Sequence, residues 1–138
     1  MALNLDRHAL IAVVLAAGAG CNTASGPDLP MCSGSVVLTL NVSPTPTLVW
    51  TPNCRVDHVL VEVPLPPSSG GGSDVTWQIA VLAEGQGVVA PVPYGVVPPS
   101  MQELVAAEPL QAGAFYRIRI YASEVTVGDL NVQYWPPD

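Results

Sequence analysis

The chain has 138 residues, of which 49% are apolar, 11% charged and 6% aromatic, with 15 Pro and 12 Gly. A chain of this length has room for one ordinary domain, so we do not expect a multidomain enzyme. Four basic and eleven acidic residues give a formal net charge of −7. Because nucleic-acid affinity comes largely from basic side chains that displace counterions, we do not expect a nucleic acid as a partner.

The first 20 residues have the pattern of a signal peptide. Arg7 precedes the apolar run 9–17, and the small residues 18–20 come directly before Cys21. As a helix, residues 9–20 would cover about 18 Å, which is too short for the roughly 30 Å hydrocarbon core of a bilayer. The segment resembles the lipobox of bacterial lipoproteins, in which the cysteine is acylated and the peptide is cut before it.

This resemblance implies a signal peptide over 1–20, a lipidated Cys21 and a short polar tether over 21–32. It also implies that the lipid attaches the chain to a membrane of the bacterial cell envelope, on the periplasmic or surface side of the outer membrane. The alternative is an ordinary cleaved signal peptide with Cys21 as a spare thiol. The odd number of cysteines favours the lipid, because acylation of one of the three leaves Cys32 and Cys54 to form a disulfide.

The spacing of Cys32 and Cys54 fits a disulfide near the open end of a hairpin. If residues 43–46 form the turn between the first two strands, the two cysteines are offset by only a residue or two from facing positions. A metal site is the alternative. Two thiols with His58 match no zinc pattern, so we expect neither a metal nor a cofactor.

From residue 35 onward, short β-type runs are separated by Pro, Gly and Asn, which predicts an all-β sandwich of about seven antiparallel strands over 33–138. Residues 64–73, rich in Pro and Gly, predict a mobile loop. Ser100 and Glu103 have capping-box spacing, which predicts a helix of at most two turns over 100–107. The predicted strands are 35–42, 47–51, 58–63, 75–82, 88–90, 115–122 and 130–135.

Two segments resemble fibronectin type III domains. Residues 38–52 (LTLNVSPTPTLVWTP) are similar to the first hairpin of that family, in which a Trp, here Trp50, fills the core. Residues 110–122 (LQAGAFYRIRIYA) resemble the corner that joins strand E to strand F in that family. The resemblance implies an immunoglobulin-like sandwich in which Trp50 and Tyr116 mark the core and the Tyr116 hydroxyl bonds to nearby backbone. The chain also resembles small bacterial lipoproteins, a likeness that brings no activity with it.

Alternation along the strands assigns the outward side chains. If Tyr116 points inward, Arg117 and Arg119 point outward, where two guanidinium groups would attract a carboxylate or phosphate. One interpretation of this face is a solvated surface with cross-strand Arg and Glu pairs. The other is a contact surface for a protein or glycan, since exposed Trp and Arg are typical of binding hot spots. The residues of this candidate contact face are His58, Glu62, Arg117, Arg119, Asn131, Gln133 and Trp135.

The sequence predicts no catalytic site. Asp57 and His58 are neighbours on a strand and therefore point to opposite faces, and no Gly-x-Ser-x-Gly elbow is present. We expect a lipid-anchored envelope module, accessory or structural, that acts by protein contact and is not an enzyme. The alternative function is a glycan-binding envelope module that uses Trp135 and Tyr94.

Overall fold

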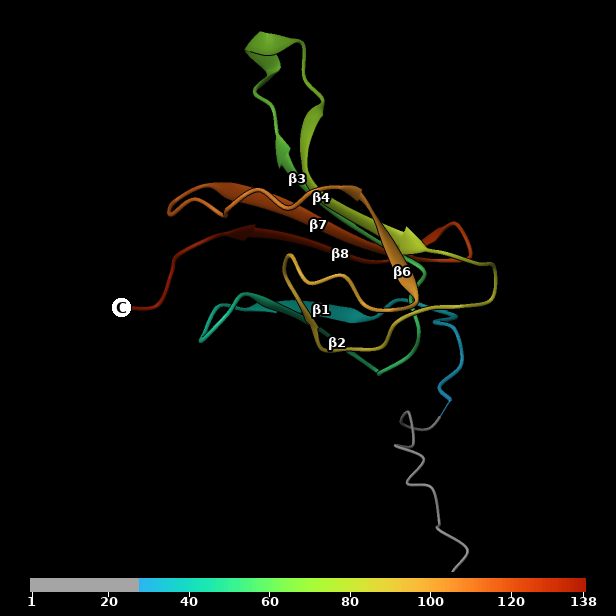
Figure 1. Cartoon of the computed structure of the whole chain (residues 1–138). Helices are drawn as coiled ribbons and strands as arrows, with labels where there is room; N and C mark the ends of the chain where they lie inside the picture. Colours follow the sequence, from blue (N-terminus) through green and yellow to red (C-terminus); the bar gives the residue numbers. More distant parts are fainter. Residues whose placement is uncertain (1–27) are drawn as a thin grey trace, which may run out of the picture.

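The computed structural model describes residues 28–138, which form an all-β sandwich of two antiparallel sheets (Figure 1). The predicted fold class is confirmed, with eight strands. The smaller sheet has the order β1-β2-β5 and the larger one β6-β4-β3-β7-β8. The strands are β1 (Val37–Asn41), β2 (Thr47–Thr51), β3 (His58–Pro64), β4 (Ser73–Val81), β5 (Val92–Pro93), β6 (Met101–Val105), β7 (Phe115–Ala122) and β8 (Val125–Gln133).

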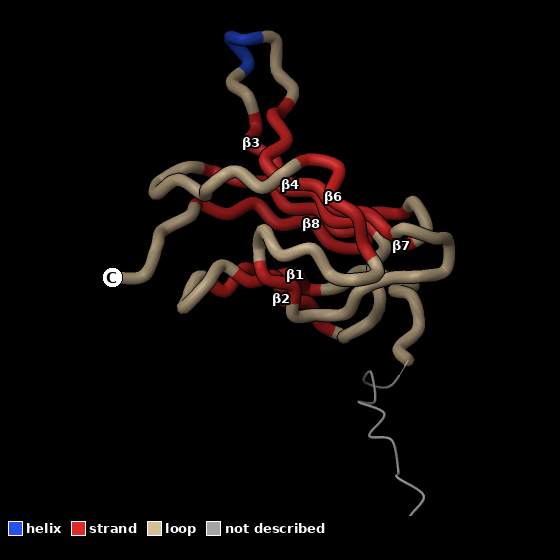
Figure 2. The backbone as a smooth tube through the Cα atoms, in the orientation of Figure 1, coloured by secondary structure: helices blue, strands red, loops and turns tan. Residues whose placement is uncertain are grey.

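The predicted signal peptide, Cys21 and the first residues of the predicted tether lie outside the described part of the chain. The β3–β4 hairpin projects from the sandwich, and its tip carries the short 3-10 turn η1 (Pro67–Ser69) (Figure 2). This hairpin contains the segment predicted as a loop over 64–73. Its pairing extends beyond the strands, because the Leu65 N–H donates to the Gly72 carbonyl at 2.9 Å.

The helix predicted over 100–107 is wrong: this segment contains strand β6, which pairs with the edge of β4. The Ser100 hydroxyl donates to the Gly87 carbonyl at 3.2 Å instead of capping a helix. The Glu103 carboxylate accepts a hydrogen bond from the Trp77 indole at 3.1 Å. A helix of two turns is marginal in isolation, so pairing with an open sheet edge outweighs the local capping pattern.

Two predicted strand boundaries also differ. Val88 forms only an isolated bridge with Val56, and β5 begins later, at Val92. The last strand begins at Val125, earlier than predicted, because Ser123 and Glu124 form a two-residue turn with φ of 50° and 67°. Left-handed backbone at both central positions is the geometry that joins antiparallel strands most tightly.

The core lies between the sheets, where both predicted core markers are buried. Trp50 is 1% exposed, and its indole N–H donates to the Cys54 carbonyl at 2.9 Å. Tyr116 is also buried, and its hydroxyl accepts a hydrogen bond from the Gln111 N–H at 2.8 Å, as predicted for the corner before β7. The other large, fully buried side chains of this core are Leu48, Val56, Val59, Val61, Trp77, Ile79, Val92, Ile118 and Ile120.

Replacing Tyr116 with phenylalanine removes the acceptor of this bond and leaves the Gln111 N–H unpaired. We expect the free energy of unfolding to fall by about 1 kcal/mol, the usual worth of one such bond. Urea unfolding of the two proteins measures the difference. Tyr134→Phe is the matched control, because among residues 28–138 no residue bonds the Tyr134 hydroxyl; equal losses in both variants would contradict the assigned role.

The predicted disulfide joins Cys32 to Cys54, with their Cα atoms 5.0 Å apart. The segment that carries Cys32 does not extend the first hairpin, because Met31 and Arg55 form a parallel bridge. The Cys32 N–H donates to the Arg55 carbonyl at 2.9 Å, and the Arg55 N–H donates to Pro30 at 2.8 Å. Residues 29–32, which we call the N-terminal strap, are therefore held on the sandwich although they were predicted as tether.

The Arg55 side chain adds a second attachment for this strap. Its Nε donates to the Leu29 carbonyl at 2.5 Å, and its Nη1 donates to the Gly85 carbonyl at 2.9 Å. One guanidinium group thus fastens the strap to the loop after β4. The position at which the chain reaches the sandwich is fixed by the disulfide and by these bonds together.

Candidate contact site

The outer face of the larger sheet carries the residues that alternation placed there. Glu62 of β3 faces Arg117 of β7, and His58 faces Tyr121. On the other side, Arg117 faces Asn131 of β8. The register therefore brings most of the predicted face together and adds Tyr121 to it as a further aromatic member.

Arg119 is held by a buried carboxylate. Its Nη2 donates to Glu62 Oε1 at 2.5 Å, and the Ser73 hydroxyl donates to Glu62 Oε2 at 2.6 Å. Glu62 is only 4% exposed, although it lies on the outer face of the sheet. The Arg119 guanidinium also lies 5.9 Å from the centre of the Tyr121 ring. Arg119 is therefore a structural partner of Glu62 rather than a cation that projects into solvent.

Arg117 is paired as well, but at the surface. It donates two hydrogen bonds to Asp129, at 3.1 Å from Nε and 2.7 Å from Nη2. The bonds from Arg117 hold the pKa of Asp129 below its ordinary value. Both arginines predicted to attract an anion thus already have a carboxylate partner across the sheet, which weakens their pull on an external anion.

His58 completes a line of contacts across the face. Its ring stacks on Tyr121 with centroids 4.9 Å apart, and its Nε2 lies 2.8 Å from Gln78 Nε2. A neutral ring with its proton on Nδ1 accepts this bond from the amide. Burial lowers the pKa of His58 below its ordinary value of 6.5, and Arg119 lowers it further, while Asp57 opposes the shift. Asp57 accepts a hydrogen bond from the Ser123 N–H instead, so Asp57 and His58 have different partners, as expected for neighbours on a strand.

The lowered pKa of His58 predicts a pH dependence of stability. Between the lowered pKa and 6.5, the unfolded chain binds a proton at this residue that the folded chain does not bind. The stabilising contribution is therefore complete above 6.5 and decreases as the pH falls toward the lowered value. We expect the difference in unfolding free energy between the parent and His58→Gln to shrink over this range. A difference that is constant or grows on acidification would contradict the assignment.

The end of the outer face at Phe115 and Gln133 carries exposed aromatic side chains. Phe115 and Gln133 are cross-strand partners, and pairing continues past β8, because the Tyr134 N–H donates to the Ala114 carbonyl at 2.9 Å. Phe115 is 61% exposed and Trp135 is 59% exposed. We call Gly113, Phe115, Gln133 and Trp135 the aromatic platform.

Gly113 fixes the position of Trp135. Atoms of the indole ring lie 3.3 to 3.8 Å from the place that a Cβ at Gly113 would occupy. Gly113 has a φ of +80°, a conformation that favours glycine. An aromatic ring that covers a glycine in this way stabilises the strand pair locally. The Gln133 amide donates to the Gly113 carbonyl at 2.9 Å, so the amide is positioned beside the ring.

Tyr94, the second residue of the predicted glycan site, has different neighbours. Its ring packs edge-to-face on the buried Trp77, with centroids 5.1 Å apart. Its hydroxyl donates to the Glu108 carbonyl at 2.5 Å. Trp135 and Tyr94 are not a stacked or edge-to-face pair within the described chain. Tyr94 is thus held by Trp77 and Glu108, and its pairing with Trp135 in one sugar platform stays a prediction.

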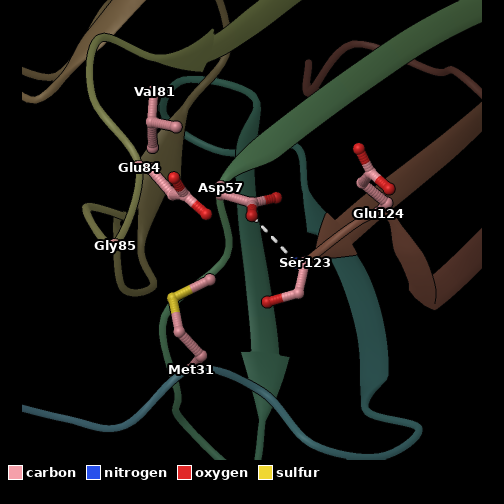
Figure 3. A pocket seen from close by; sticks show the side chains of 7 residues that line it. All are labelled: Met31, Asp57, Val81, Glu84, Gly85, Ser123 and Glu124. Atoms are coloured by element: carbon pink, nitrogen blue, oxygen red, sulfur yellow. Dashed lines mark hydrogen bonds between the residues drawn. The ribbon is translucent and has the colours of Figure 1, made fainter.

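The opposite end of the sandwich, where the strap lies, is acidic. Here an open hollow of about 550 Å³ is surrounded by Asp57, Glu84 and Glu124, with the strap residue Met31 on one side (Figure 3). The Asp57 carboxylate accepts a hydrogen bond from the Ser123 N–H at 2.8 Å, which stabilises the β7–β8 turn. Asp57 therefore has a structural role at this end.

Within residues 28–138, no group of three or more His, Cys, Asp or Glu is arranged to hold a metal ion. No helix in this part of the chain is long and apolar enough to cross a membrane.

Comparisons with family models, with curated proteins and with solved structures found no match to this chain. The fold and the site define the described part of the chain as an all-β domain of two antiparallel sheets with a strap fastened by a disulfide.

Proposed function

We propose that this chain is a lipid-anchored module of the bacterial cell envelope that acts by contact and not by catalysis. In this proposal, acylated Cys21 attaches the chain to the membrane, and the sandwich presents a surface to other envelope components as an accessory or structural subunit. The fibronectin type III-like character of the domain belongs to the same proposal. It is supported by Trp50 in the core and by the hydroxyl of Tyr116 bonded to backbone five residues upstream.

The observation that carries this proposal is the placement of the strap and the aromatic platform at opposite ends of the sandwich (Figure 1). Met31 of the strap and the turn residues Ser123 and Glu124 line one hollow. The platform lies at the other end of strand β7, which has 8 residues. At about 3.3 Å per residue, this strand separates the two ends by about 23 Å. A chain held at the strap end would therefore present Phe115 and Trp135 away from its attachment.

The charge of the two ends supports the same orientation. The strap end carries Asp57, Glu84 and Glu124 around its hollow, so anionic lipid would repel it. Attachment to a membrane would then depend on several acyl groups together, since a single acyl group binds only marginally and a protein with four basic and eleven acidic residues offers no electrostatic anchor to anionic lipid.

Fractionation of cells that express the Cys21→Ser variant tests the anchor. We expect the parent in the membrane fraction and the variant in the soluble fraction, because the variant lacks the acylated thiol. A Cys32→Ser, Cys54→Ser variant is the control for a general effect of cysteine loss, and it should remain with the membrane. Unchanged membrane association of Cys21→Ser would overturn the proposed anchor.

A further inference from the structure

We propose that the aromatic platform is a binding site for a neutral glycan chain. This inference rests on the proposed function, in which the platform end is the end that makes contact. It replaces the pairing of Trp135 with Tyr94 by a different set of residues: Gly113, Phe115, Gln133 and Trp135.

The Trp135 ring of the platform is positioned before any ligand arrives. One side of the Trp135 indole packs on Gly113, and yet the side chain is 59% exposed. Phe115 lies diagonally across the strand pair from Trp135, a relation that places side chains about 7 to 8 Å apart at the backbone. The C–H groups of a sugar ring carry a small positive charge and are attracted to the negative face of an aromatic ring. A ring that is already fixed loses little conformational entropy on binding.

The polar group beside the rings suits hydroxyl groups. The Gln133 amide is oriented by its bond to the Gly113 carbonyl. Within residues 28–138 this amide makes no other hydrogen bond, so its oxygen and its second N–H remain for a ligand. An amide both donates and accepts, as a sugar hydroxyl does. The aromatic rings therefore match the C–H groups of a sugar ring, and the amide matches its hydroxyl groups.

Charge selects a neutral glycan over an acidic one. The platform residues carry no charge, and the nearest outward cation along β7, Arg117, is neutralised by Asp129. The whole chain has a net charge of −7. A polyanionic glycan would be repelled by the chain and would find no unpaired guanidinium on this face.

Size favours a glycan over a protein as the occupant. A stable protein interface buries about 800 Å² on each partner and uses about 20 to 30 residues a side. The platform offers two exposed rings, and the outward residues next to them are the polar Asn131 and Gln133. Two rings with an amide match the footprint of a few sugar units.

Tryptophan fluorescence gives a direct measurement, because Trp50 and Trp77 are fully buried and only Trp135 of the three tryptophans is exposed. We would titrate the mature chain with cello-oligosaccharides and chito-oligosaccharides as neutral probes and with heparin fragments as an acidic probe. The expected result is a saturable change in emission and protection from acrylamide quenching with at least one neutral probe. Heparin should give neither.

Variants separate binding from the loss of the fluorophore. Phe115→Ala keeps Trp135 and should weaken binding at least tenfold, and Trp135→Ala, followed by calorimetry, should abolish it. Val125→Ala is the matched control, because Val125 is 62% exposed at the other end of the same hairpin, and it should bind as the parent does. A flat response to both neutral probes, or binding that survives in both platform variants, would overturn the glycan site.

Failure of the glycan site is distinguishable from failure of the proposed function. The titration does not depend on the lipid, so the anchor is tested separately by fractionation of Cys21→Ser. If the platform contacts a protein in the envelope and binds no glycan, the contact function stands and the glycan inference falls.

Discussion

Replacing Arg119 with alanine is expected to lower the free energy of unfolding by about 3 kcal/mol, which is a large share of the 5 to 15 kcal/mol of an ordinary domain. The reason is that the buried Glu62 carboxylate would lose its ion-pair partner. Glu62 is 4% exposed, and without Arg119 the Ser73 hydroxyl would be its one remaining hydrogen-bond partner among residues 28–138. We place the expected loss at the lower end of the range for broken buried pairs, because the Arg119 side chain is 26% exposed. Urea unfolding at neutral pH measures the loss.

Two variants test this explanation. Adding Glu62→Gln to Arg119→Ala removes the uncompensated charge and should recover part of the lost stability. Arg117→Ala is the matched control, since Arg117 and Asp129 are both exposed and their pair should not change the unfolding midpoint measurably. A double variant no more stable than Arg119→Ala would mean that the loss comes from packing of the Arg119 stem and not from the buried charge.

Loss of the disulfide is expected to have an effect of similar size. Cys32 and Cys54 are 22 residues apart, and closing a loop of that length stabilises by about 3 kcal/mol in the chain-entropy model. The double variant Cys32→Ala, Cys54→Ala should therefore unfold at lower urea concentration. Its fold should persist, because Arg55 still holds the strap through Leu29, Pro30 and Gly85.

A reductant provides the control for this prediction. Dithiothreitol should destabilise the parent to about the level of the double variant and should leave the double variant unchanged. Mass measurement under non-reducing conditions establishes that the thiols are paired before the experiment. If reductant shifts both proteins equally, or neither, the stability assigned to the disulfide is wrong.

Local patterns predicted the strands with clear alternation and failed where tertiary pairing decides. Residues 115–122 alternate between buried and more exposed positions, and both this run and 58–63 lie in the strands expected. The capping-box spacing of Ser100 and Glu103 is a local property, whereas the edge of β4 that recruits β6 is a property of the folded sheet. The first half of β8 was missed because its alternation is short: only Val125 and Val127 are apolar before Gly128 and Asp129 interrupt the pattern.

The outward direction of the candidate site residues followed from alternation, but their partners did not. Glu62 and Arg119 are separated by 57 positions, so their contact depends on the register between β3 and β7. Tyr121 and Phe115 could have been assigned to the same face, because both alternate with the inward Tyr116. The packing of Trp135 on Gly113 depends on backbone pairing beyond the end of β8, and alternation gives the direction of the ring but not this partner.

Photocrosslinking in the native envelope tests most directly the claim that the anchored sandwich makes contact through its platform end. A photoreactive phenylalanine analogue would replace either Phe115 or Val125 in the full chain; these positions are 61% and 62% exposed at opposite ends of the β7–β8 hairpin. We expect crosslinks to envelope material from position 115, lost on Trp135→Ala, and few from position 125. Equal crosslinking from both positions, or crosslinks from position 125 alone, would contradict it.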